Sequence, residues 1–165
     1  TPPSRHRWLC NFSINLKDTN MQVKIKKLTA TATTPTYGSA GAAAFDFYAD
    51  LNGHWAGIPP RGTLVLHTGI AIEVPEGCVL RIYSRSGHGF KHGVSLANSV
   101  GVIDSDYRGE LAVALRNDSH AGFAINHGDR IAQGIIEPIH RVEFEVADEL
   151  SATERGTGGF GSTGA

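Results

Sequence analysis

Apolar and polar residues alternate with a period of two at several places along the chain, which predicts short β-strands. In residues 64–74 the apolar side chains fall on one face of an extended chain, while His67 and Glu73 fall on the other. Residues 75–77 then supply turn chemistry, and alternation resumes over residues 78–83, so a hairpin is expected. The same pattern predicts further strands at residues 23–25, 45–49, 111–115, 131–139 and 142–146.

Helical periodicity is nearly absent. No stretch keeps an apolar spacing of i, i+3, i+4 and i+7, so helix is expected for only a turn or two, around residues 87–92. Short strands separated by turns are typical of a closed barrel or a sandwich. Residues 1–20 are polar and aperiodic, and we interpret them as a dispensable N-terminal extension.

Length and charge exclude several classes of protein. The 165 residues suit one domain, and the net charge of −1 provides no large positive field for a nucleic-acid polymer or an anionic membrane. No apolar run approaches the ~20 residues of a membrane span. Two cysteines and no apolar leader segment favour a reducing, cytoplasmic location over secretion.

The glycine-rich segment 155–164 is the most informative part of the sequence. It contains Arg155, the aromatic Phe160 and two hydroxyl side chains, which together could clamp phosphates and stack on a base. A flexible tail is the competing interpretation. Phe160 argues against it, because a bulky apolar ring serves no purpose in a solvated spacer.

Four other segments carry weaker signals. Residues 84–91 place Arg-Ser-Gly after a predicted strand, where an anion could bind, although an ordinary surface turn has the same composition. Residues 98–109 combine a carboxylate, an amide and an aromatic ring around an acidic turn. Residues 43–47 and 128–133 contribute Asp46, expected to face solvent, and Gln133, whose amide needs a partner. His88 and His92 are spaced for zinc, but without a third ligand we interpret them as a solvated pair.

In this order, the five segments closely resemble the five motifs of the trimeric deoxyuridine triphosphate pyrophosphatases, or dUTPases. The resemblance covers residues 21–165. It implies an all-β, single-domain distorted β-barrel, jelly-roll-like, over residues 21–147, with at most one short helix. A flexible C-terminal arm, residues 148–165, would close over the active site. The implied reaction is Mg²⁺-dependent cleavage of dUTP to dUMP and pyrophosphate in a homotrimer with sites shared between chains.

The resemblance also implies the roles of single residues in the segment 98–109. Asp104 would orient and activate the attacking water, and Tyr107 would lie under the deoxyribose and leave no room for a 2′-hydroxyl. The uracil edge would be read by Asn98 and by the backbone of Gly101, Val102 and Ile103.

The phosphates would be held elsewhere in the chain. By resemblance, Arg85, Ser86 and Gly87 would bind phosphates, Gln133 would reach the α-phosphate, and Asp46 would contact Mg²⁺ through water. From the arm, Arg155 would clamp the γ-phosphate, Phe160 would stack over uracil, and the triphosphate would be enclosed by Gly161, Ser162 and Thr163.

The chain departs from the family pattern at residues 88–90, His-Gly-Phe, because the family usually places an aliphatic residue directly after Arg-Ser-Gly. Two other functions compete with the dUTPase interpretation. A dCTP deaminase of the same superfamily would need a glutamate acid/base beside the pyrimidine, and the 155–164 clamp argues against it. A nucleotide-sensing trimeric interaction protein is the alternative from another class.

Overall fold

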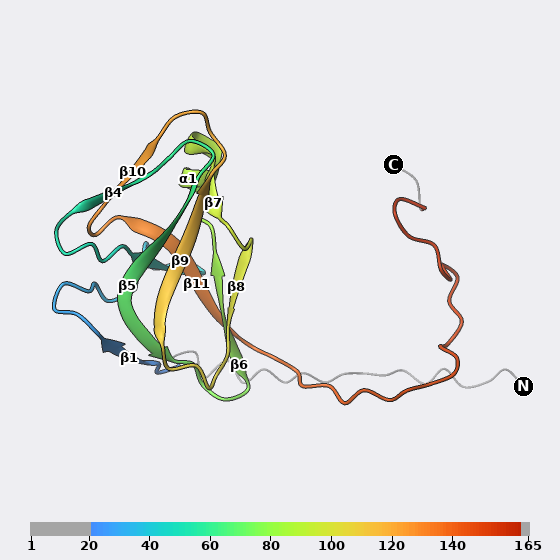
Figure 1. Ribbon diagram of the computed structural model, residues 1–165. Helices are drawn as coiled ribbons and strands as arrows, with labels where there is room; N and C mark the ends of the chain where they lie inside the picture. Colours follow the sequence, from blue (N-terminus) through green and yellow to red (C-terminus); the bar gives the residue numbers. More distant parts are fainter. Residues whose placement is uncertain (1–20, 163–165) are drawn as a thin grey trace, which may run out of the picture.

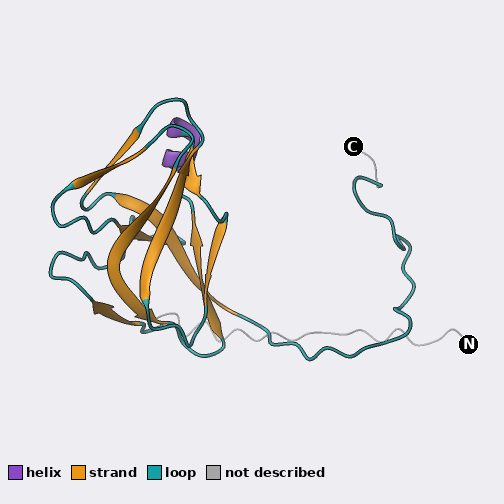
Figure 2. Cartoon of the chain, in the orientation of Figure 1, coloured by secondary structure: helices purple, strands orange, loops and turns teal. Residues whose placement is uncertain are grey.

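The computed structural model describes residues 21–162. Within them the chain forms eleven strands and one helix. In chain order these are β1 (Lys24–Lys27), β2 (Thr36–Tyr37), β3 (Phe45–Tyr48), β4 (Trp55–Ile58), β5 (Thr63–Glu73), β6 (Cys78–Tyr83), α1 (Ser86–His92), β7 (Val94–Leu96), β8 (Val100–Ile103), β9 (Glu110–Asn117), β10 (Phe123–Asn126) and β11 (Arg130–Pro138). The predicted all-β class with one short helix is confirmed (Figure 2).

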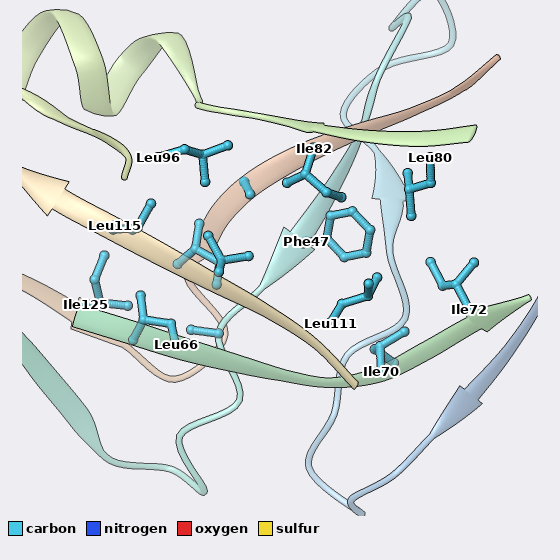
Figure 3. Close-up of a cluster of buried hydrophobic side chains, with 14 of the residues drawn as sticks. Phe47, Leu66, Ile70, Ile72, Leu80, Ile82, Leu96, Leu111, Leu115 and Ile125 are labelled. Atoms are coloured by element: carbon cyan, nitrogen blue, oxygen red, sulfur yellow. The ribbon is translucent and has the colours of Figure 1, made fainter. Parts of the chain in front are cut away.

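The strands pair as three antiparallel sheets, with the orders β1-β5-β9-β7, β2-β3-β11-β6-β8 and β10-β4 (Figure 1). The two larger sheets enclose the core. Leu66 and Leu115 from one sheet and Phe47 and Leu80 from the other are almost fully buried between them (Figure 3). No helix among residues 21–162 has the length and apolar character that crossing a membrane requires.

Strand β5 shows how the alternating pattern is realised. Leu66 and Ile70 are buried, whereas His67 is exposed, as predicted. The pairing of β5 with β9 is interrupted between His67 and Ala71 by an irregularity centred on Gly69, whose φ is 65°. A Cβ at Gly69 would lie 2.5 Å from Asp50 Oδ2, so both the backbone conformation and the space require glycine here.

Asp50 ties the loop before β2 to the sheets. Its side chain is only 4% exposed. It accepts hydrogen bonds from the hydroxyls of Thr29 and Thr31. Burial by itself raises the pKa of Asp50, but these hydrogen bonds, one from the backbone of Asn52 and the field of His127 outweigh burial and hold the pKa below its usual value.

The strand predicted at residues 142–146 is wrong. After β11 the chain leaves the sheets (Figure 1), and no strand is assigned between residues 139 and 162. Phe144 is 94% exposed and Val146 is 98% exposed. The residues alternate as a strand should, but within one chain no sheet edge pairs with them.

Candidate functional site

Asp46 joins two arginines at the end of the five-stranded sheet. Its carboxylate is buried, with the residue 8% exposed, which corrects the expectation that it faces solvent. Arg85 Nε donates to Asp46 Oδ1 at 3.2 Å, and Arg130 Nη1 donates to Asp46 Oδ2 at 3.1 Å. The two guanidinium groups compensate the buried charge.

Arg85 is held by a second acceptor as well. Its Nη1 donates to the backbone carbonyl of Arg130 at 3.0 Å, and the same carbonyl accepts a hydrogen bond from His88 Nε2 at 2.8 Å. Among residues 21–162 the structure records no partner for Arg85 Nη2. That nitrogen can therefore donate to a ligand.

Gln133 lies beside this cluster because of the strand register. On β11 it pairs with Asp46 of β3 on one side and with Tyr83 of β6 on the other. Its Nε2 donates to the Ser84 carbonyl at 3.1 Å, which supplies the partner that its amide needs. The structure thus brings Asp46, Arg85 and Gln133 together, from three segments far apart in sequence.

Helix α1 begins directly after Arg85. Ser86 and Gly87 are its first two residues, and both are exposed. Arg85 occupies the N-cap position in an extended conformation and caps no N–H with its side chain. The helix ends at His92, and Gly93 caps it with a left-handed φ of 64°.

The segment 98–109 forms a second part of the site, and it crosses from β8 in the five-stranded sheet to β9 in the four-stranded sheet. Asn98 and the three residues that follow Val100 line a pocket of about 180 Å³, closed on the far side by β9. Gly101 packs closely on β6, since a Cβ there would lie 3.1 Å from Ile82 Cβ. This pocket is narrow and largely apolar, and Asn98 supplies its amide at the rim.

Asp104 and Tyr107 lie in the turn between β8 and β9. Asp104 is exposed and borders a different hollow, of about 800 Å³, that residues 73–79 also line. The Tyr107 hydroxyl donates to the Glu110 carbonyl at 2.9 Å, so the ring folds back over Gly109. Glu110 was not predicted as part of the site. It contributes its backbone carbonyl to this contact, and because every residue has such a group, the sequence could not indicate it.

The two parts are far apart in one chain. In the β6–β8 ladder Tyr83 pairs with Val100 and Leu80 pairs with Ile103. Arg85 therefore follows one end of the ladder, and Asp104 follows the other. At about 3.3 Å per residue, their backbones are on the order of 20 Å apart.

The glycine-rich segment stays away from both parts. Its recorded hydrogen bonds are internal, including Arg155 Nε to the Gly158 carbonyl at 2.7 Å and Ser162 N to the Gly159 carbonyl at 3.0 Å. Phe160 is fully exposed and has a φ of 52°. The structure does not bring Arg155, Phe160, Gly161 or Ser162 together with the rest of the predicted site, and Thr163 lies outside the described residues.

The side chains present offer no metal cage. Among residues 21–162 no three His, Cys, Asp or Glu side chains gather as ligands, and His88 and His92 instead pack their rings against Phe123. Each Asp46 oxygen uses one hydrogen bond, and a carboxylate oxygen can accept two. Asp46 can therefore still accept from the water of a hydrated ion, the form in which Mg²⁺ usually binds beside phosphates.

Comparisons with known proteins identify close relatives. A family model described as dUTPase matches residues 30–164. The deoxyuridine 5′-triphosphate nucleotidohydrolase of Nautilia profundicola is 45% identical over 144 residues, which cover 87% of this chain and 99% of that protein. The enzyme of the same name from Wolinella succinogenes is 44% identical over 144 residues, covering 87% of this chain and 95% of that protein.

Solved structures agree. A Staphylococcus bacteriophage 80alpha dUTPase variant with dUpNHpp superimposes with a TM-score of 0.80 at 26% identity, covering 88% of this chain and all 100% of that one. A dUTPase variant from phage phi11 of S. aureus, solved to show the coordination of a structural Mg(II) ion, gives a TM-score of 0.72 at 23% identity, covering 80% of this chain and 100% of that one. The second likeness concerns the fold alone.

Proposed function

Because the chain belongs to the dUTPase family and hydrolyses dUTP to dUMP and pyrophosphate, we propose that the two separated parts of its site bind the two ends of that substrate. The Asp46–Arg85–Gln133 cluster would hold the phosphates, and the segment 98–109 would hold the nucleoside. The reaction limits uracil incorporation into DNA and supplies dUMP for thymidylate synthesis. The observation that carries the assignment is the assembly of Asp46, Arg85 and Gln133 through strand register.

At the phosphate end, the unused Nη2 of Arg85 donates to a phosphate oxygen while Asp46 and the Arg130 carbonyl fix the other guanidinium nitrogens. The exposed start of α1, at Ser86 and Gly87, adds backbone and hydroxyl donors. Gln133 reaches the α-phosphate. A dUTP molecule carries about four negative charges, so donors fixed in advance stabilise both binding and the transition state.

At the nucleoside end, Asn98 reads the uracil edge, helped by the backbone groups of Gly101, Val102 and Ile103. The small volume of the pocket supports the exclusion of a thymine methyl group. Tyr107, held by its bond to the Glu110 carbonyl, lies under the deoxyribose and excludes a ribose 2′-hydroxyl.

Asp104 would be the catalytic base. Its carboxylate orients a water molecule and takes a proton from it as the water attacks the α-phosphorus in line with the departing pyrophosphate. It also accepts a hydrogen bond from the sugar 3′-hydroxyl. Asp46 would hold a hydrated Mg²⁺ beside the phosphates through a water molecule, and the ion would neutralise part of their charge.

The distance between the two parts supports a homotrimer with shared sites. The water on Asp104 must lie within contact distance of the α-phosphate held by Gln133, yet in one chain these residues are about four ladder positions, roughly 13 Å, apart. A site drawn from two chains removes this conflict. The exposed alternating segment 142–146 and a groove of about 700 Å³ lined by Val23, Tyr37 and Phe45 offer apolar surface for such an assembly.

The arm, residues 148–165, would complete the site of another chain. Arg155 would clamp the γ-phosphate, Phe160 would stack over uracil, and Gly161, Ser162 and Thr163 would enclose the triphosphate. The complete exposure of Phe160 in the single chain supports this role, because stacking on a base gives the ring an apolar contact. We also propose a cytoplasmic location, which the unpaired, buried Cys78 supports.

One assay tests the function and its catalytic base. The purified protein with dUTP and Mg²⁺ should yield dUMP and pyrophosphate, and with dCTP it should release no ammonia. Asp104→Asn should lower turnover by roughly 10²–10⁴ while dUpNHpp still binds, because the amide keeps the shape but cannot take a proton. Near-full activity of this variant would remove Asp104 from the role.

A further inference from the structure

We propose that His88 is a positioning residue that fixes the phosphate-binding guanidinium of Arg85. The inference rests on the proposed role of Arg85 as a phosphate ligand and adds a residue that no motif assigns to the site. His88 lies on the first turn of α1, three residues after Arg85.

The geometry joins the two side chains through one acceptor. His88 Nε2 lies 2.8 Å and Arg85 Nη1 lies 3.0 Å from the same oxygen, the Arg130 carbonyl. A carbonyl oxygen only accepts, so Nε2 carries the hydrogen, and two lone pairs suffice for both donors. The 3.4 Å separation of Arg85 Nη1 and His88 Nε2 is then a side-by-side contact of two donors rather than a hydrogen bond between them.

The imidazole is itself held in place. Its ring packs edge-on against Phe123 of β10, with the centroids 5.3 Å apart. The bond to the Arg130 carbonyl therefore joins α1 to the start of β11, which is also the strand that carries Gln133. His88 fixes the acceptor of Arg85 Nη1 and limits where the guanidinium can move.

His92 provides a matched comparison within the same helix. It lies one turn further on and also packs against Phe123, with the centroids 4.9 Å apart. No hydrogen bond links its ring to Arg85 or Arg130 in the described structure. A substitution at His92 thus removes aromatic packing alone, whereas a substitution at His88 removes the packing and the bond.

The experiment compares triphosphate and nucleoside affinity in the full-length protein with Mg²⁺. Calorimetric titrations with dUpNHpp and with deoxyuridine are run on wild type, His88→Leu, His88→Gln, His92→Leu and Arg85→Gln. Since α1 has no buried residue, the changes at His88 and His92 leave the core intact. Arg85→Gln removes one of the two cations beside the buried Asp46, so thermal unfolding of every variant is measured alongside the titrations.

His88→Leu should weaken dUpNHpp binding roughly 3- to 10-fold, the worth of one hydrogen bond, and leave deoxyuridine affinity within about twofold. His88→Gln should restore most of the loss, because its amide can donate from a similar position. His92→Leu should change neither affinity. Arg85→Gln should weaken dUpNHpp binding more than His88→Leu does, and it should leave the affinity for deoxyuridine unchanged.

Other outcomes are distinguishable. Unchanged dUpNHpp affinity in His88→Leu, beside a loss in Arg85→Gln, overturns the positioning role and leaves the proposed site intact. Equal losses in His88→Leu and His92→Leu assign the effect to packing on Phe123 and also overturn it. Unchanged affinity in Arg85→Gln overturns the phosphate role of Arg85, and the inference with it.

Discussion

Tyr107 owes its position to its immediate neighbours. Its hydroxyl donates to the Glu110 carbonyl, and its ring occupies the space where a side chain at residue 109 would lie. A Cβ at Gly109 would be 2.4 Å from the tyrosine oxygen. The ring is thus set before substrate arrives, which suits a group that selects against a ribose.

Replacing Tyr107 with Ala should lower the ratio of kcat/KM for dUTP to that for UTP by about tenfold or more, because the space for a 2′-hydroxyl opens. Steady-state kinetics with both nucleotides measure the ratio. Tyr107→Phe keeps the ring and should keep most of the discrimination. If the ratio stays the same in Tyr107→Ala, another group discriminates between the sugars.

Asp50 should make stability depend on pH in the acid range. Its pKa is lowered in the folded protein, so its contribution is complete above the usual aspartate pKa of about 3.9 and is lost as the pH falls through the folded value. Asp50→Asn should cost about 1–3 kcal/mol at pH 7, and the difference from wild type should shrink below about pH 4.

Urea unfolding at equal protein concentration between pH 7 and pH 3 measures this. Asp118→Asn is the control, because Asp118 pairs with Arg116 at the surface, where such pairs contribute little. A cost of Asp50→Asn that is constant across this range would contradict the interpretation.

Among the elements, β5 depends on its one irregular position. Gly69 and Gly77 both have positive φ, 65° and 74°, but a Cβ at Gly77 would meet nothing within 4 Å, whereas one at Gly69 would overlap Asp50 and Ala32. Gly77→Ala should therefore cost about 1–2 kcal/mol of unfolding free energy for the backbone conformation alone. Gly69→Ala should cost about 1–3 kcal/mol more for the overlap.

Denaturant unfolding of both variants gives the difference between them. Equal costs would show that the neighbourhood of Gly69 relaxes around a methyl group.

The elements also show what the sequence could predict. Strand β9 buries every second residue, so its alternation was sufficient, and the lack of helical periodicity limited helix to α1. The hairpin expected from residues 64–74 and 78–83 is wrong, because β5 and β6 belong to different sheets. Trp55-Ala56-Gly57-Ile58 of β4 does not alternate, and its pairing with β10 was missed. The segment 142–146 alternates but has no partner edge in one chain.

The residues of the candidate site could be named from the sequence, but their geometry could not. The motifs pointed to Asp46, Arg85 and Gln133, which register then brought together. Asp46 can be buried because Arg85 and Arg130, which lie in other parts of the chain, donate hydrogen bonds to its carboxylate. A period-2 pattern within one strand carries no information about these partners.

At the scale of the whole molecule, a site of the proposed homotrimer takes the segment 98–109 and the arm from different chains, so two defective chains should repair each other. Asp104→Asn and a chain truncated after Leu150, refolded at equal ratio, should together give about a quarter of wild-type activity. A working site then needs its segment 98–109 from the truncated chain and its arm from the substituted one, each with a chance of roughly one half.

The measurement is dUTP turnover of the co-refolded sample, with mixed trimers confirmed by mass. Activity no higher than that of the two variants refolded separately would show that one site draws the segment 98–109 and the arm from the same chain.

The length of the β6–β8 ladder also links activity to protein concentration. A chain released from the proposed homotrimer would carry every group proposed for the reaction, but with Asp104 and Arg85 at opposite ends of a rigid strand pair. No internal motion short of breaking the sheet brings them together. In the proposed homotrimer, specific activity would therefore decline on dilution, and substrate that bridges two chains would oppose the decline by stabilising their association.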